Sequence, residues 1–382
     1  MTNTPSRRPV ARTFVRLSRA LGLVVLSACA GHRVAPPASG LTASLEREIS
    51  VSEDLTVFTL FALLNAAGYD DENREAGMHP VRLQVRETVR QRISPGFQEE
   101  LRRFYEGHLQ HASPWSYLVV AKATAGPPSF TPTAEWRQDL APDPRFGPLG
   151  DLHGLLRRFY VEVPVQQLYE HVRPAYQEYI RRYREVIFRE TVAALRYCRA
   201  NLTQLTASGE RQRPVVIPNL LQSYEYATSL ILGDRFISVE GPQERIGYNP
   251  HEFLHAITNP AVYTPATDAL RDQLRPLMEE SIGALGAPSS RYRTLAAFVD
   301  ENLVRTVSLR YLVAARPDRE SEFESEMMDE WKSGYSLMRF FWEQLILYER
   351  QAADLRAYYP TMLTRLDPAA ELARWRAARK PE

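Results

Sequence analysis

The stretch His251-Glu252-Phe253-Leu254-His255 is the most informative part of this chain for predicting its fold, because it places two imidazoles four residues apart. On a helix these two side chains share one face, so both can offer a neutral nitrogen to a single metal ion. This arrangement is typical of zinc-hydrolase sites, where the ligand nitrogens lie about 2.0–2.1 Å from the metal. Glu252 would then face the water that such a metal makes acidic. The stretch therefore predicts a metal-binding helix.

The flanking residues predict where this helix begins and ends. Asn249 can cap the N-terminus, and Pro250 fits the first helical position, where its missing N–H costs nothing. Pro260 disfavours helical geometry at Asn259, the residue before it, so we expect the helix to stop there. The result is a short helix of about three turns.

Three short apolar runs precede the helix, at residues 215–217, 230–232 and 236–239, and each predicts a strand. Gly233-Asp234 between the last two predicts a hairpin turn. Helical spacing dominates elsewhere, as in residues 55–67, 81–109 and 152–205, with an interruption at Ser94-Pro95-Gly96 and a break or a bend at Pro164 and at Pro174. We expect an α+β fold that is predominantly helical, with a small antiparallel sheet next to the metal helix. A strand edge beside that helix would suit an extended peptide.

A catalytic zinc usually takes a third protein ligand and leaves its fourth position to water. No histidine follows His255, so the third ligand should be a carboxylate from a later helix. Glu301 lies in a stripe of small and apolar residues, and a buried carboxylate needs a partner such as a metal. Glu279 and Glu280 are the alternatives, although Glu279 falls on the polar side of its helix. Without a metal, Glu301 would form an exposed pair with Arg305 one turn further on.

An HExxH motif followed by a glutamate on a later helix resembles the gluzincin superfamily of zinc peptidases. More narrowly, residues 249–260 together with 301–305 are similar to uncharacterised bacterial gluzincin-like families, many of them secreted or lipidated, and the likeness covers residues 211–315. It implies a zincin-like fold, with His251, His255 and Glu301 as zinc ligands and Glu252 as general base. The chain lacks the thermolysin-type Asn-Glu motif and the Gly-x-Met-x-Asn signature of M1 enzymes, so the resemblance implies no substrate preference.

Gluzincins also need a donor for the oxyanion that forms during hydrolysis, usually a tyrosine or a histidine. Tyr311 is our candidate, because it falls on the same predicted helix as Glu301. Tyr248, Tyr263 and Tyr292 compete with it, and sequence spacing does not rank them.

The N-terminus carries a second informative pattern. Five arginines between positions 7 and 19 precede a short apolar core, and residues 26–29 then read Leu-Ser-Ala-Cys. This run resembles the lipobox of bacterial lipoproteins, which implies cleavage before Cys29 and lipidation of Cys29. The apolar core is too short to remain as a membrane-spanning helix. Ala30, where an aspartate would indicate inner-membrane retention, favours the outer membrane of the cell envelope.

These patterns divide the chain into four parts: a signal peptide at 1–28, the lipidated cysteine and a tether at 29–45, a mainly helical region at 46–210, and a zincin-like metallopeptidase region at 211–382. The 47 Lys and Arg nearly balance the 46 Asp and Glu, which gives no electrostatic basis for a nucleic-acid partner. Cys198 is the one cysteine besides Cys29, so no intrachain disulfide is expected once Cys29 is lipidated.

The sequence thus predicts a lipid-anchored zinc metallopeptidase that acts on a peptide or protein substrate. Glu252 would take a proton from the zinc-activated water and return it to the leaving amine. The alternative is a non-catalytic envelope lipoprotein whose peptidase-like domain binds a partner. Substrate specificity and oligomeric state are left open by the sequence.

Overall fold

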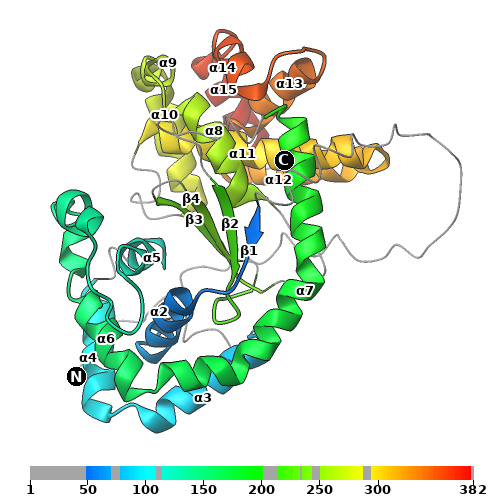
Figure 1. Ribbon diagram of the computed structural model, residues 1–382. Coiled ribbons are helices and arrows are strands. Elements are labelled where there is room, and N and C mark those ends of the chain that lie inside the picture. The colour runs from blue at the N-terminus through cyan, green and yellow to red at the C-terminus, as the bar shows by residue number, and fades with distance from the viewer. Residues whose placement is uncertain are drawn as a thin grey trace, which may run out of the picture. The chain divides into compact units, whose positions relative to one another are not determined.

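The computed structural model describes residues 49–69, 78–108, 114–200, 213–224, 226–232, 235–242, 250–286 and 294–379. Gly40–Glu382 make up one compact unit (Figure 1), in which both the region 46–210 and the region 211–382 lie. The predicted signal peptide, the lipobox with Cys29 and the tether fall outside the described residues, as do the predicted turn Gly233-Asp234, Asn249, Tyr248 and Tyr292.

The N-terminal part is helical, as predicted. Its α-helices are α2 (Leu55–Ala66), α3 (Pro80–Arg92), α4 (Pro95–Gly107), α5 (Pro114–Lys122) and α6 (Leu152–Glu162), with a π-turn at Trp136–Leu140 and a 3₁₀ turn at Gly147–Leu149. Asp54 caps α2 by accepting the Val57 N–H at 2.9 Å. Prolines at the first helical position begin α3 and α4, so the predicted interruption between these two helices is confirmed.

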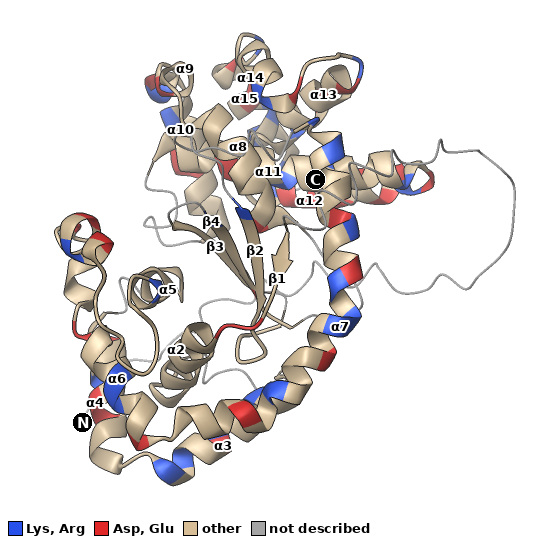
Figure 2. Cartoon of the chain, in the orientation of Figure 1, with Lys and Arg blue, Asp and Glu red and all other residues tan. Residues whose placement is uncertain are grey.

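Helix α7 (Val165–Tyr197) is 33 residues long and links the N-terminal helices to the C-terminal ones, passing the sheet on its way (Figure 1). Pro164 separates it from α6 as predicted, whereas Pro174 lies inside α7 without ending it. Acidic and basic residues alternate along its length (Figure 2), which is typical of a helix with one face in water.

The sheet contains β1 (Ser50–Val51), β2 (Arg213–Pro218), β3 (Ala227–Leu232) and β4 (Arg235–Glu240), in the order β1-β2-β4-β3. Strands β3 and β4 pair antiparallel, as the hairpin prediction requires, but β2 pairs parallel with both β4 and β1. The expected antiparallel sheet is therefore wrong, and the sheet is mixed. Strand β3 lies at the edge of the sheet, and β4, which follows it in the sequence, lies between β3 and β2. No local sequence pattern indicates which strand pairs with β2.

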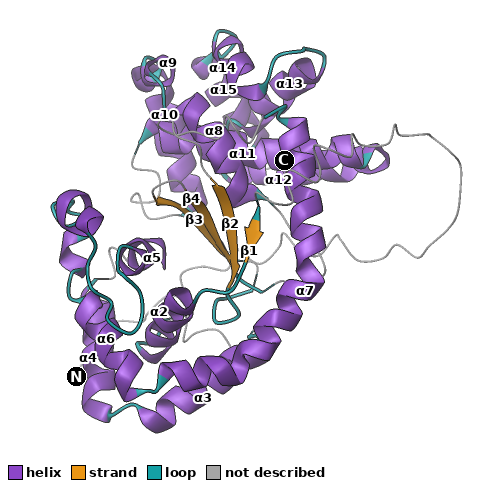
Figure 3. Cartoon of the chain, in the orientation of Figure 1, coloured by secondary structure: helices purple, strands orange, loops and turns teal. Residues whose placement is uncertain are grey.

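The C-terminal part is also helical (Figure 3). It comprises α8 (His251–Val262), α9 (Pro265–Asp268), α10 (Arg271–Leu285), α11 (Leu295–Ala315), a 3₁₀ turn (Pro317–Arg319), α12 (Glu320–Ser333), α13 (Met338–Glu349), α14 (Leu355–Leu363) and α15 (Pro368–Ala378). The fold is thus α+β and mostly helical. None of the helices that the structure describes is long and apolar enough to cross a membrane.

Two apolar cores meet at the sheet. Ile217, Leu230 and Ile237 pack into a core shared with α2, α5 and α6, whereas Phe236 belongs to the core of the C-terminal helices. Phe236 meets Phe253 of α8 edge to face, with the ring centroids 6.0 Å apart. The sheet therefore lies between the N-terminal helices and α8, and this packing fixes the position of the histidine-bearing helix.

Candidate metal centre

Helix α8 begins at His251, as the motif predicts, but its two ends differ from the prediction. Pro250 occupies the capping position rather than the first helical position. At the other end Pro260 lies inside the helix, and the Tyr263 N–H still donates to the Asn259 carbonyl at 2.9 Å. The expected stop at Asn259 is wrong because a proline removes only its own N–H from the ladder, and α8 continues to Val262. Its 12 residues give the predicted three turns.

The two histidines lie side by side on α8. Their ring centroids are 5.0 Å apart with the rings nearly perpendicular, and their side chains are 19% and 16% exposed. One potential ligand atom from each of His251, Glu252 and His255 lies within 4.8 Å of the others. The helix therefore produces the cluster that its sequence spacing requires.

Glu301 of α11 faces both histidines. Its Oε1 lies 3.8 Å from Nε2 of His251, and its Oε2 lies 3.8 Å from Nε2 of His255. Ligands about 2.0–2.1 Å from a tetrahedral metal are separated from one another by about 3.3–3.5 Å. Each of the two imidazoles thus faces a different oxygen of Glu301 at a somewhat longer separation, and two imidazoles with a carboxylate are donors that zinc accepts.

Asp300 orients the second histidine. Its Oδ2 lies 2.6 Å from Nδ1 of His255, and its side chain is 4% exposed. A carboxylate that accepts the Nδ1 proton leaves Nε2, which faces Glu301, as the nitrogen that would bind a metal, and this is the usual support for a zinc-bound histidine. Sequence reasoning missed this residue. The available signal was an aspartate directly after the apolar pair Phe298-Val299, where a solvated carboxylate is not expected.

The carboxylates also set the protonation state of His255. Burial alone would lower its pKa, but the Asp300 carboxylate, followed by Glu252 and Glu301, outweighs burial and raises the pKa of His255 to about 9. The imidazole would have to be neutral to bind a metal, so zinc and a proton compete for this site.

Glu252 receives a hydrogen bond from the sheet. The Ser229 hydroxyl of β3 donates to Oε2 of Glu252 at 2.8 Å. Burial raises the pKa of Glu252 above its ordinary value, although the charge of His255 and the Ser229 hydrogen bond pull it down. A raised pKa suits a carboxylate that must both take up and release a proton. Ser229 is a second site residue that the sequence did not reveal.

The alternative ligands lie elsewhere. Glu279 is exposed on α10, and Glu280 pairs with Arg376 of α15. Glu301 is therefore the carboxylate that the structure brings to the histidines. It also forms the expected pair with Arg305, with 2.7 Å between Nε and Oε1, but both side chains are largely buried rather than exposed.

The structure does not bring Tyr311 to the histidines. It lies ten residues beyond Glu301 on α11, a rise of about 15 Å along a helix. It is 1% exposed, and burial and Glu190 of α7 raise its pKa. Tyr263 directly follows α8 and is 55% exposed, and burial together with the charges of Asp300 and Glu301 raises its pKa to about 12. The charges of Asp300 and Glu301 therefore act on Tyr263, whereas neither carboxylate is among the causes of the Tyr311 shift.

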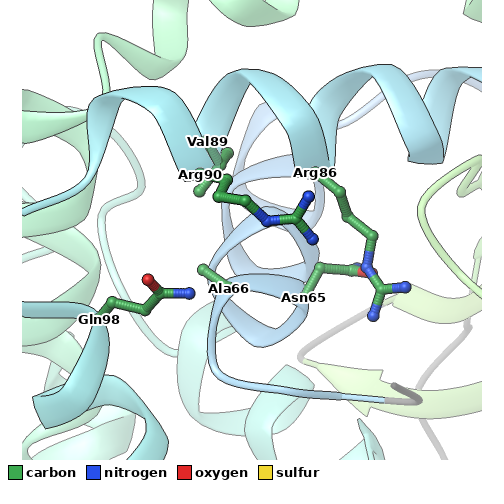
Figure 4. A pocket seen from close by; sticks show the side chains of 6 residues that line it. All are labelled: Asn65, Ala66, Arg86, Val89, Arg90 and Gln98. Carbon is green, nitrogen blue, oxygen red and sulfur yellow. The ribbon is translucent and has the colours of Figure 1, made fainter. Parts of the chain in front are cut away.

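A separate hollow of about 90 Å³ lies between α2, α3 and α4 (Figure 4). Its lining residues are Asn65, Ala66, Arg86, Val89, Arg90 and Gln98. The polar groups around it serve the fold: Asn65 donates to the Phe61 carbonyl at 2.7 Å, and Arg86 donates to the Tyr69 carbonyl at 3.2 Å. None of the predicted site residues lines this hollow.

The fold and the site together define an α+β chain with a histidine-carboxylate cluster between two helices. No protein-family model matches the chain, and the searches of curated proteins and of solved structures likewise found no match. The resemblance to gluzincins therefore depends on the sequence motif.

Proposed function

We propose that this chain is a zinc-dependent peptidase of the gluzincin type, anchored to the bacterial cell envelope through Cys29. The observation that carries the proposal is the convergence of Glu301 on His251 and His255 from a separate helix, at 3.8 Å from each ring. Two histidines on one helix follow from sequence alone, but a carboxylate aimed between them requires the tertiary fold. Glu252 completes the set beside them.

Each residue has a distinct task in this proposal. Zinc at this cluster would polarise the scissile carbonyl and make a water acidic. Glu252 takes the proton and returns it to the leaving nitrogen, and its raised pKa matches both steps. Asp300 keeps His255 in the ligating tautomer. Tyr263, on which the charges of Asp300 and Glu301 act, is our candidate for the hydroxyl that donates to the developing oxyanion.

The outer edge of β3 supports a peptide as the substrate. The Gly241 N–H donates to the Tyr226 carbonyl at 2.7 Å, which makes residues 226 and 241 a hydrogen-bonded pair. Such pairs alternate along an antiparallel ladder, so the backbone groups of Ala227, Ser229 and Ile231 point away from β4. No described strand lies beyond β3. A peptide added there as a strand would run past Glu252, which Ser229 touches.

Zinc content tests the proposed centre. The mature domain, purified with zinc present and without chelator, should hold about one zinc per chain, and Glu301→Ala should lose most of it. Glu280→Ala is the matched control, because Glu280 also pairs with an arginine but lies away from the histidines. A parent without zinc, or an equal loss in both variants, would overturn the site.

Glu252→Gln separates catalysis from metal binding. The variant should keep its zinc and lose about 10²- to 10⁴-fold in hydrolysis of a fluorescently labelled, unfolded casein. Zinc in the parent without hydrolysis of casein or of a mixed peptide library would favour the non-catalytic lipoprotein instead.

Lipid anchoring has its own test. Cells that express the full chain should carry it in the membrane fraction, extractable with detergent, and Cys29→Ser should release it or leave it unprocessed. Equal membrane attachment of the two forms would contradict lipidation at Cys29.

A further inference from the structure

Arg305 stands next to the proposed ligand Glu301 in a setting unlike that of a surface ion pair. Its Nε donates to Oε1 of Glu301 at 2.7 Å, from one turn further along α11. The other carboxylate oxygen of Glu301 is the one that faces Nε2 of His255 at 3.8 Å. The oxygen that the guanidinium holds, Oε1, is also the one that lies 3.8 Å from Nε2 of His251, so fixing it directs the carboxylate at both imidazoles.

Arg305 is itself held from two further directions. Its Nη1 donates to both oxygens of Glu330 on α12, at 3.2 and 3.3 Å. Its guanidinium lies over the ring of Tyr335, 3.9 Å from the centroid. The side chains of Arg305 and Glu330 are 14% and 12% exposed. A guanidinium fixed by a carboxylate and an aromatic ring has little freedom, so it can impose an orientation on Glu301.

Charge alone does not account for this arrangement. A positive guanidinium beside a zinc ligand would repel Zn²⁺, but the Glu330 carboxylate on its other side offsets that charge. The pair Arg305–Glu330 is therefore close to neutral toward the metal, and its remaining effect on Glu301 is geometric. An exposed pair on a helix would not restrict the glutamate in this way, because both side chains would exchange rotamers in water.

We infer that Arg305, clamped by Glu330 and Tyr335, is a positioning residue that sets Glu301 in its ligating orientation before zinc binds. The inference rests on the proposed zinc site, and it gives Arg305 the same task toward Glu301 that Asp300 has toward His255. Loss of residues that orient a metal ligand typically weakens metal binding by about 10- to 100-fold.

The test measures zinc affinity by competition with a chelator, with three variants. Arg305→Met should weaken zinc binding by about 10- to 100-fold. Arg305→Lys keeps the charge but loses the planar fork, so it should recover only part of that loss. Tyr335→Leu removes the ring contact without changing any charge, and it should also weaken zinc binding.

Arg310→Met is the matched control. Arg310 is buried on the same helix five residues on, pairs with Glu349 and Glu320, and lies over Trp342, but it does not contact Glu301. Its replacement should lower the stability of the metal-free fold and leave zinc affinity unchanged. If Arg305→Met lowers zinc affinity no more than Arg310→Met at matched folded fraction, Arg305 has only a structural role.

The remaining outcomes are equally decisive. Zinc affinity within threefold of the parent in both Arg305 variants, or tighter binding in Arg305→Met, would overturn the inference. If the parent binds zinc and loses it in Glu301→Ala while Arg305→Met is unaffected, the proposed function stands and only the role of Arg305 falls. A parent that binds no zinc would overturn both.

Discussion

The two halves of α11 bury similar ion pairs for different ends. In the first half Arg305 lies between Glu301 and Glu330 over a tyrosine ring. In the second half Arg310 lies between two other carboxylates, those of Glu349 and Glu320, over a tryptophan ring. The charges and the aromatic cover are alike, although Glu320 and Glu349 are more exposed than Glu301 and Glu330, so neither charge nor aromatic cover marks a functional site by itself.

The difference lies in what the carboxylates face beyond the arginine. Glu301 and Asp300 in the first half are also directed at the imidazoles of α8. In the second half the carboxylates of Glu320 and Glu349 both pair with Arg310. Glu349 also accepts a hydrogen bond from the Tyr197 hydroxyl at 2.9 Å. A buried carboxylate aimed at histidines from another helix is therefore the informative feature, and the predictions that follow test this contrast.

The largest effect on folding should come from Arg310→Met. Breaking a buried ion pair typically costs about 3–5 kcal/mol, and we expect about 3 kcal/mol because Glu349 and Glu320 keep some contact with water. Urea unfolding of the metal-free protein measures this loss. Zinc affinity should not change, and a parallel loss of zinc would erase the distinction between the two halves.

Asp300→Ala should lower zinc affinity and should leave the ion pairs of Arg310 intact. Without its carboxylate, His255 loses the partner that fixes its tautomer, and zinc affinity should fall by about 10- to 100-fold. Asp300→Asn, whose amide oxygen can still accept from Nδ1, should lose less. Chelator competition gives both values, and equal affinities for all three proteins would remove Asp300 from the site.

Glu326 of α12, next to the Arg305–Glu330 pair, should make the free energy of unfolding depend on pH. It lies one turn before Glu330 on α12, and burial, with Glu330 and Asp329 adding to it and Arg319 opposing, raises its pKa to about 7. Because the folded pKa exceeds the ordinary value of 4.5, the associated stability is complete below pH 4.5 and is lost as pH rises through 7.

Glu326→Gln should therefore be more stable than the parent at pH 8 by about 1–2 kcal/mol, discounted for partial exposure, and the difference should shrink toward pH 4. Denaturant unfolding across this range measures it. A constant difference at all pH values would show that Glu326 does not titrate there.

The smallest effect should follow Tyr311→Phe. Its buried hydroxyl has no hydrogen-bond partner within the described residues, so its removal should change stability by less than about 1 kcal/mol and leave hydrolysis intact. Tyr263→Phe should instead slow hydrolysis while keeping zinc. The reverse result in a casein assay would restore Tyr311 as the oxyanion donor.

Local patterns were sufficient for most of the helices and for the β3–β4 hairpin. Prolines and capping residues mark the starts of α2, α3 and α4, and the histidine spacing alone sets two imidazoles on one face of α8. Local patterns do not predict the order of the strands. Strand β2 pairs parallel with β4, although β3 lies between them in the sequence, and no short stretch of residues encodes such a pairing.

The sequence by itself determined helix α8 and the placement of its two histidines and Glu252, because a periodicity of 3.6 residues places them without reference to the rest of the chain. It also narrowed the third ligand to Glu301 or Glu279 and Glu280. Only the tertiary structure shows that Glu301, rather than Glu279 or Glu280, lies beside the histidines, and that Asp300 and Ser229 contact His255 and Glu252. Helix α11 is buried on nearly all sides, so no single apolar stripe shows which of its residues faces α8.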